Sequence, residues 1–427
     1  MIRKIFYVRL LLTSTPFVPK QNVFHNGLLK ENIMNPAARA LRLSYQVIKD
    51  PWTNLKRKYL PFPELNQSID INLKHAIMWL HMTHKVTNYR GSAAAFRYSK
   101  GWEPAYPETT GYIAKSLFEY SDFSSQKKYF DEAIAMCDWL IEIQKKDGGI
   151  NEGSIKDRSR KPSVIFNTGM VMLGWIEAYK RTNDMKYMKA LTKAGDFLEE
   201  IRKDDRLWLK HCYQNILHTY HSRVAWAILE LHSLSQKQGY LDTALDIYSW
   251  VLSQQKENGY FENCCFEKDY RTCNTHGIAY TLRGLLEGYK ILHDNRYLES
   301  VIKTSEVLMR KFEIKKFLQT SYNEKWKPIV DTECLTGIAQ HSFIWFKIYE
   351  LTDDIRYLNA GLDATDLLCY LQNINSRSKD IRGAISGSHP IWGIYAPFQY
   401  PNWATKFFVD ALMLRLKITK DLEERLP

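Results

Sequence analysis

Residues 129–182 read YFDEAIAMCDWLIEIQKKDGGINEGSIKDRSRKPSVIFNTGMVMLGWIEAYKRT and contain the unit from which the fold can be predicted. The stretch opens with an amphipathic helical pattern, continues through a polar, glycine-containing loop, and ends in a second helical pattern that is apolar around most of its circumference. A helix with one apolar stripe packs on one side, whereas a helix that is apolar all round is buried on several sides. The stretch therefore predicts an outer helix, a loop and an inner helix.

The same unit recurs about every 57 residues along the chain. Each copy begins at an aromatic or aliphatic anchor, with steps of 60, 58, 53, 57 and 60 residues between Ile69, Tyr129, Tyr187, Tyr240, Tyr297 and Tyr357. Ten and eleven residues after each anchor stands an apolar pair: Trp79-Leu80, Trp139-Leu140, Phe197-Leu198, Trp250-Val251, Val307-Leu308 and Leu367-Leu368. Repeats of this length indicate stacked copies of one supersecondary unit. Six copies predict an all-α (α/α)6 toroid of six outer and six inner helices.

The loops of the six copies differ in length according to their direction. The expected inner helices span residues 109–122, 167–182, 220–236, 274–293, 335–353 and 402–417, and a short connection leads from each of the first five to the next outer helix. The loops from outer to inner helices are long, at about 88–108, 145–164, 203–219, 256–273, 313–334 and 372–401. Long loops in a compact domain are usually functional. All six are expected at one end of the ring, where the N-termini of the inner helices favour anionic groups.

Residues 1–60 lie outside the repeat and form a basic N-terminal extension, while residues 61–427 form the toroid, the expected catalytic domain. The extension is expected to pack on the ring through a helix near residues 35–49. No apolar run reaches the length of a membrane span. The start, MIRKIFYVRLLLTSTPFV, is a poor signal peptide because Arg9 interrupts its apolar run. We therefore expect a cytoplasmic location, with a secreted or periplasmic location as the alternative.

The net charge of +12 favours an anionic partner. The basic residues are dispersed and show no recognition-helix pattern, so an acidic glycan is expected rather than a nucleic acid. Seven cysteines without a C-x-x-C pair predict reduced thiols rather than a metal site. The sequence has neither a P-loop nor a dinucleotide-binding glycine fingerprint, and we expect no cofactor and no metal.

The start of the third inner helix carries the most specific group of candidate catalytic residues. His218, Tyr220 and Arg223 lie within one short segment, and His276 stands at the corresponding position of the next copy. Proton abstraction next to a carboxylate needs an imidazole or phenol to move the proton and a guanidinium to neutralise the carboxylate. These residues therefore predict a catalytic set, and the competing interpretation is a buried structural network.

Carboxylates and aromatic side chains of the other loops complete the predicted site. Glu108 and Glu333 are candidate catalytic carboxylates, although Glu108 could equally cap the helix that follows it. Aromatic rings flanked by glycine and proline can stack on sugar rings, and the competing interpretation is aromatic core packing. The expected substrate-binding residues are Trp102, Glu103, Tyr106, Asp147, His389, Trp392, Tyr400, Asn402 and Trp403.

The six hairpins, with aromatic and carboxylate loops at one end, resemble the six-hairpin glycosidase-like carbohydrate-active enzymes over about residues 69–417. That group includes polysaccharide lyases, unsaturated glucuronyl hydrolases and sugar epimerases. The set Asn215, His218, Tyr220 and Arg223 is similar in residue types to the Asn-His-Tyr-Arg constellation of toroid lyases, which gathers its residues from several helices. The resemblance implies an enzyme that processes an acidic, uronate-containing polysaccharide or oligosaccharide.

Several reactions remain open at this point. Proton abstraction by a lyase or C5-epimerase is the main prediction, and hydrolysis by a carboxylate pair is the alternative. A non-catalytic glycan-binding toroid would keep the aromatic residues but tolerate loss of His218, Tyr220 and Glu108. An isoprenoid cyclase or prenyltransferase-like protein is a further alternative, because QKKDGGINEG at residues 144–153 resembles the Gln-x-x-Asp-Gly repeat of the cyclases. That repeat's terminal Trp and the D-x-D-D acid motif are absent from the sequence.

Overall fold

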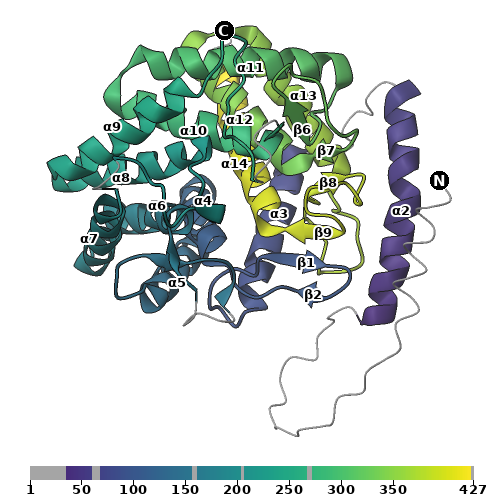
Figure 1. Ribbon diagram of the computed structural model, residues 1–427. Coiled ribbons are helices and arrows are strands. Elements are labelled where there is room, and N and C mark those ends of the chain that lie inside the picture. The colour runs from purple at the N-terminus through teal and green to yellow at the C-terminus, as the bar shows by residue number, and fades with distance from the viewer. Residues whose placement is uncertain (1–34, 60–67, 156–160, 203–205, 267–271, 425–427) are drawn as a thin grey trace, which may run out of the picture.

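The computed structural model describes residues 35–59, 68–155, 161–202, 206–266 and 272–424, and twelve of its helices alternate between two layers of a ring (Figure 1). The outer helices are α3 (Ile69–Lys85), α5 (Lys127–Ile143), α7 (Met185–Glu200), α9 (Gln238–Ser253), α11 (Asn295–Lys315) and α13 (Ile355–Leu371). The inner helices are α4 (Pro107–Ser124), α6 (Ile165–Thr182), α8 (Ser222–Ser235), α10 (Thr275–Leu292), α12 (Leu335–Thr352) and α14 (Asn402–Glu423). The predicted (α/α)6 toroid is confirmed.

The short turns between inner and outer helices follow from the residues at the helix ends. Helices α6, α10 and α12 end at residues with left-handed φ angles of 56°, 55° and 55°, which are Asn183, His293 and Asp353. An aspartate comes next in each case and accepts a hydrogen bond from the backbone N–H two residues later, as seen for Asp184, Asp294 and Asp354. A left-handed residue ends a helix and an Asp at the N-cap starts one. Two residues therefore reverse the chain.

The ring closes between its first and last helices. Helix α14 packs against both α3 and α4. Asn72 of α3 donates from Nδ2 to Oε1 of Gln372 at 2.6 Å, across 300 residues of sequence. Ser116 of α4 donates from Oγ to Oδ1 of Asp410 in α14 at 2.5 Å. The six copies thus form one closed unit.

Hydrogen bonds between the long loops form a continuous belt around one rim of the ring. Strands β1 (Ala95–Arg97), β2 (Gly101–Trp102) and β9 (Gln399–Pro401) join the first loop to the sixth. Strand β5 (Thr272–Asn274) pairs with β6 (Ser321–Asn323), and β7 (Glu333–Cys334) pairs with β8 (Ser388–His389). The remaining neighbours are linked by backbone N–H donation from Ile155 to Ala105, Ile165 to His211 and Thr219 to Asn263. Neighbouring loops can bond to one another in this way only at the same end of the ring, as the loop lengths predicted.

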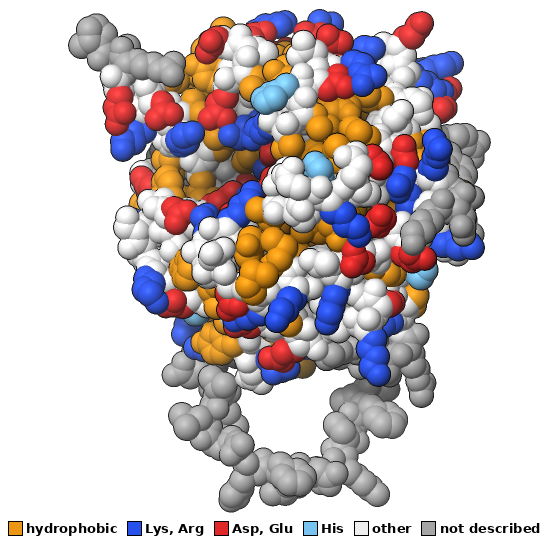
Figure 2. All heavy atoms as spheres, turned by 90° about the vertical axis from the view of Figure 1, so that its left-hand side faces the viewer, with side chains coloured by type: hydrophobic (Ala, Val, Ile, Leu, Met, Phe, Trp, Pro, Cys, Tyr) orange, Lys and Arg blue, Asp and Glu red, His pale blue; other side chains and the backbone are white. Residues whose placement is uncertain are grey.

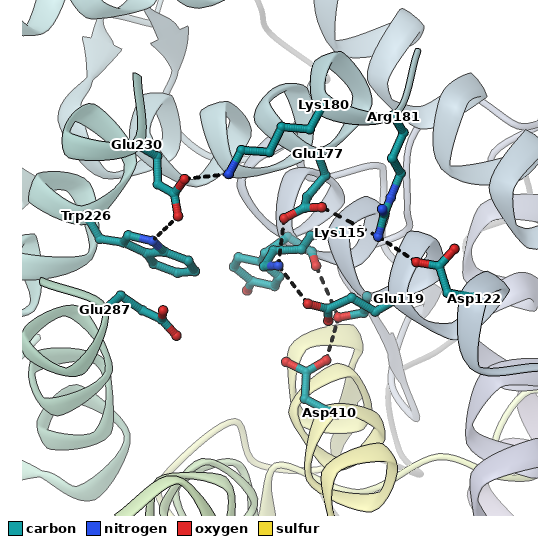
Figure 3. A network of polar contacts seen from close by, with 12 residues as sticks. Lys115, Glu119, Asp122, Glu177, Lys180, Arg181, Trp226, Glu230, Glu287 and Asp410 are labelled. Carbon is teal, nitrogen blue, oxygen red and sulfur yellow. Dashed lines mark hydrogen bonds and ion pairs between the residues drawn. The ribbon is translucent and has the colours of Figure 1, made fainter. Parts of the chain in front are cut away.

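At the other end of the ring, ion pairs join the inner helices around a cavity of about 880 Å³ (Figure 3). Nζ of Lys115 in α4 lies 2.7 Å from a Glu119 oxygen and 3.0 Å from a Glu177 oxygen of α6. Nζ of Lys180 in α6 lies 2.6 Å from Oε2 of Glu230 in α8. Charges removed from water need such partners. The pairs therefore connect α4, α6 and α8 where the ring interior is polar.

Helix α2 (Pro36–Tyr59) lies beside the rim, outside the ring (Figure 1). The helix expected near residues 35–49 is present but continues for ten further residues. Residues 1–34 of the predicted extension, including the poor signal peptide, lie outside the described residues. In the part of the chain that is described, no helix is both long and apolar enough to cross a membrane.

Gly111 allows a close approach between the inner helices α4 and α6, and we expect Gly111→Ala to destabilise the ring. A Cβ at Gly111 would lie 2.5 Å from Cα of Val171 and 2.6 Å from the Met170 carbonyl oxygen, so backbone must move. Such overpacking costs roughly 1–3 kcal/mol in unfolding free energy, measurable by chemical denaturation. Gly239→Ala is the matched control, because its Cβ meets only the flexible carboxylate of Glu199. Equal stability of the two variants would contradict this account of the helix contact.

Candidate functional site

A cavity of about 440 Å³ opens at the rim where the inner helices begin, and we call it the rim pocket. Its lining combines rings, amides and carboxylates, which is typical of a site for a polar ligand with apolar faces. The lining residues are Tyr106, Glu108, Glu152, Gly153, Val164, Phe166, Asn167, Tyr213, Tyr220, Phe266, Asn274, His276, Tyr280, Thr320, Ile394, Tyr395, Ala396 and Trp403. The candidate residues that the structure brings together here are Tyr106, Glu108, Tyr220, His276 and Trp403.

Glu108 is the carboxyl group placed deepest in the rim pocket. Tyr106 and Pro107 precede it at the start of α4, so the helix N-terminus projects its side chain toward the pocket. Burial raises the pKa of Glu108 to about 7, although the hydrogen bond from the Tyr106 hydroxyl and the positive charge of Arg223 lower it. A carboxyl group with a pKa near neutrality can both donate and accept a proton under ordinary conditions. Glu108 is thus suited to general acid–base chemistry.

Glu152 is the second carboxylate of the rim pocket. It follows β3 (Ile150–Asn151) in the second loop and is exposed, unlike Glu108. Burial raises the pKa of the Tyr106 hydroxyl well above its ordinary range, and the charges of Glu108 and Glu152 raise it further. Both carboxylates therefore raise the pKa of the same phenol, that of Tyr106. The pocket holds one carboxyl group in apolar surroundings and another near water. Such a difference in surroundings allows one carboxyl group to act as an acid and the other as a base.

His276 enters the pocket as a neutral hydrogen-bond donor. Its backbone N–H donates to Oδ1 of Asn274 at 2.9 Å, which caps α10. Gln340 donates from Nε2 to Nδ1 of His276 at 2.5 Å, and its donation to the Thr336 carbonyl oxygen fixes the orientation of the amide. Burial lowers the pKa of His276 well below its ordinary range, and the charge of Arg223 lowers it further. The proton of the neutral ring therefore resides on Nε2.

Tyr220 lines the rim pocket but His218 does not. The His218 ring is stacked on Tyr220 with centroids 4.7 Å apart and planes at 10°, on the side away from the pocket. Burial lowers the pKa of His218. His218 was predicted to exchange a proton with substrate, but Tyr220, on which it stacks, lines the rim pocket in its place. His218 supports the Tyr220 ring instead.

Arg223 lies beneath the rim pocket rather than in it. Its guanidinium carbon is 4.6 Å from the centroid of the Tyr280 ring and 5.5 Å from that of Phe407, and Tyr280 forms the pocket wall. The guanidinium faces a small cavity of about 10 Å³ that it shares with Asp410. Arg223 was predicted to hold a substrate carboxylate, but it does not line the rim pocket, and Tyr280 lies beside it in the pocket wall. Its charge still acts on Glu108 and His276 through the protein.

Three other predicted carboxylates do not line the rim pocket. Glu103 forms an ion pair with Arg97 at 2.7 Å from Oε1 to Nε. Asp147 accepts hydrogen bonds from the Ser163 hydroxyl at 2.8 and 2.9 Å and so holds the turn of the second loop. Glu333 is buried in strand β7. None of the three lines the rim pocket, and Glu103 and Asp147 hold loop structure in place.

The remaining predicted binding residues also hold the rim together outside the pocket. Trp102 donates from Nε1 to Oδ1 of Asp380 at 3.0 Å, and Trp392 packs half-buried against the core. Asn402 donates from Nδ2 to the Ser92 hydroxyl, the Ala93 carbonyl and the Thr109 hydroxyl. The other two corrections are His389, buried in β8, and Tyr400, whose hydroxyl meets Tyr98 and Asn373.

The sequence reasoning missed several wall residues, most clearly Tyr280 and Phe166. Tyr280 stands one turn after His276 on the same helix face, and their ring centroids are 4.2 Å apart. The i, i+4 spacing in α10 was the available signal. Phe166 is the second residue of α6, and its ring centroid is 5.0 Å from that of Tyr220. Trp403 was predicted, and its Nε1 donates to the hydroxyl of Tyr395 at 2.8 Å.

The charge on the face shown in Figure 2 is mixed in sign. Basic and acidic side chains are interspersed there, with apolar side chains between them. A nucleic-acid footprint is a continuous basic patch or stripe. This face therefore does not have the surface expected of a nucleic-acid-binding protein.

No protein-family model matches the sequence, and no curated protein matches it. The fold, however, is similar to solved unsaturated glucuronyl hydrolases. One, specific for heparin, superimposes with a TM-score of 0.63 at 15% identity, covering 82% of this chain and 98% of that chain. The enzyme from Bacillus sp. GL1 gives 0.65 at 12% identity over 82% and 97%, and that from Streptococcus agalactiae gives 0.61 at 11% over 81% and 90%. The likeness shows that this chain shares the toroid fold of these enzymes.

Proposed function

We propose that the protein hydrolyses a glycosidic bond in a uronate-containing oligosaccharide, with Glu108 as the proton donor. The observation that carries the proposal is the Glu108 carboxyl group, which faces the rim pocket, accepts a hydrogen bond from Tyr106 and has a pKa raised to about 7 by burial. General acids of glycosidases are carboxyl groups of this kind. The fold shared with the glucuronyl hydrolases supports the same reaction class.

In the proposed reaction, Glu108 gives its proton to the leaving glycosidic oxygen as the bond to the anomeric carbon breaks. Glu152, at the exposed side of the pocket, accepts a proton from the water whose oxygen bonds to that carbon. Each carboxyl group changes its protonation state once, so the protons balance. The aromatic walls Phe166, Tyr220 and Tyr280 provide apolar faces for the sugar ring.

The uronate carboxylate would be recognised mainly by neutral donors. Among the described residues of the pocket wall, none is a Lys or Arg. Side chains that can donate include Asn167, Tyr213, Asn274 and His276, and the pocket also faces the N-terminal ends of α6 and α10. Helix N-termini bind anions through free N–H groups and the helix dipole. Arg223 adds positive charge from beneath the wall.

Hydrolysis is better supported than the lyase or epimerase reaction, which was the main prediction from the sequence. Proton abstraction needs a cation against the substrate carboxylate and an accessible base beside it. Arg223 stands behind Tyr280, and His218 stands behind Tyr220. The pocket instead offers two carboxylates.

A panel of uronate oligosaccharides, with and without a C4–C5 double bond, distinguishes the reactions. We expect new reducing ends without a gain in ultraviolet absorbance, because hydrolysis forms no double bond. A gain in absorbance would indicate a lyase, and deuterium uptake from solvent without new reducing ends would indicate an epimerase. Either result would overturn the proposed function.

A further inference from the structure

Helix α2 contacts the sixth long loop through a buried aspartate. Asp50 is 2% exposed, and its Oδ2 accepts a hydrogen bond from the backbone N–H of Ile391 at 2.7 Å. Its Oδ1 accepts from Nε2 of Gln46 on the same helix at 2.6 Å and lies 3.9 Å from Nδ1 of His389. A carboxylate is costly to bury and is found inside proteins where it makes specific bonds. Asp50 is therefore directed at the loop segment around Ile391.

That segment leads directly into the wall of the rim pocket. Ile391 accepts a backbone hydrogen bond from Phe398 at 2.8 Å, which closes residues 391–398 into a compact loop. Ile394, Tyr395 and Ala396, all inside this loop, line the pocket. The Tyr395 ring lies 5.4 Å from that of His276. The backbone group held by Asp50 is thus only three residues from the first wall residue.

The ring itself does not depend on α2 for closure. Helices α3, α4 and α14 close it, and β1 pairs with β9 without any contribution from residues 36–59. The buried carboxylate of Asp50 adds a bond to a loop, not to the helical core. A role in holding that loop explains why a polar side chain occupies this position.

We propose that α2 is a clamp for the rim pocket and that Asp50 is a positioning residue, which holds the wall 391–398 in its binding geometry. The inference rests on the proposed function for its effect on turnover. Asp50 does not touch the substrate. It acts through Ile391 on the placement of Tyr395, and so on the fit of the sugar ring.

Hydrogen exchange of residues 388–398 in the full chain tests the clamp without any substrate. We expect Asp50→Ala to accelerate exchange of these amides roughly tenfold, because a buried N–H loses its acceptor. Asp50→Asn should retain slow exchange, since the new amide oxygen can still accept from the Ile391 N–H. The Gln46 side-chain amide can rotate by half a turn, so that its oxygen accepts from the new amide nitrogen. Tyr45→Ala is the matched control, because Tyr45 lies on the exposed face of α2. Unchanged exchange in Asp50→Ala, or equal acceleration in Tyr45→Ala, overturns the clamp.

Kinetics with the uronate oligosaccharide then test the link to function. Asp50→Ala should raise KM roughly tenfold with little change in kcat, because the wall is displaced while Glu108 is not. Asp50→Asn should restore KM. A roughly tenfold fall in kcat with unchanged KM would refute a positioning role. If the wild-type protein does not hydrolyse the panel, the proposed function fails, while the exchange experiment still decides whether α2 holds the wall.

Discussion

Replacing Glu108 by glutamine is expected to reduce turnover of a uronate oligosaccharide by roughly 100- to 10 000-fold, the usual contribution of a general acid. Glutamine keeps the size of the side chain and can accept the Tyr106 hydrogen bond, but it has no proton to give to the leaving oxygen. KM should change little, because the walls of the pocket are intact. Steady-state kinetics on purified variants measure both quantities.

Two further variants complete the Glu108 experiment. Glu103→Gln is the matched control, since Glu103 lies in the preceding loop and pairs with Arg97 outside the pocket. Its turnover should stay near that of the wild type. Tyr220→Phe should be mild, because the Tyr220 ring serves as a wall. If Glu108→Gln retained its rate and Tyr220→Phe lost it, proton abstraction would replace hydrolysis.

The dependence of turnover on pH follows from the same carboxyl group. Glu108 must be protonated to act as an acid, and its pKa is raised to about 7. We therefore expect kcat/KM to fall as the pH rises through about 7. The opposite slope would assign Glu108 the role of base, and Glu152 would then be the remaining candidate for the acid.

The fold could be predicted from the sequence because its signals are local and repeated. Each copy restates the anchor, the apolar pair and the long loop, and pairs such as Asn183-Asp184 and Asp353-Asp354 mark the reversals. A pattern that recurs six times can be recognised even where one copy is irregular. The long loops also indicated the end of the ring at which the pocket opens.

The composition of the pocket could be predicted only in part, because loop membership does not determine the direction of a side chain. Asn402 and Trp403 are neighbours at the start of α14, yet Trp403 faces the pocket and Asn402 bonds the first loop. Tyr280 was missed because polar and apolar faces are hard to separate in a helix that is apolar all round. The sequence correctly predicted that Arg223 lies at the start of an inner helix. The Tyr280 ring that covers it, however, belongs to a different copy of the repeat. Contacts between different copies cannot be predicted from the sequence near either residue.

Glu108→Gln is also expected to stabilise the protein at high pH, by up to roughly 3 kcal/mol in unfolding free energy. The pKa of Glu108 is raised from an ordinary value of 4.5 to about 7 in the folded chain. The wild-type protein therefore has its full stability below about pH 4.5, where Glu108 is protonated in both states. It loses stability as the pH rises through about 7, because the buried group must ionise. Glutamine does not ionise, so this loss is absent from the variant.

Chemical denaturation of both proteins between pH 4 and pH 8 measures the effect. The difference in unfolding free energy should be small at the acid end and should grow toward pH 8, with the variant the more stable. A constant difference across the range would mean that Glu108 is not held in apolar surroundings, and its assignment as the acid would lose its basis. A variant that gains stability while losing turnover is the pattern expected when a charge is buried for chemistry rather than for folding. The opposite changes in stability and rate therefore test the site more sharply than either one alone.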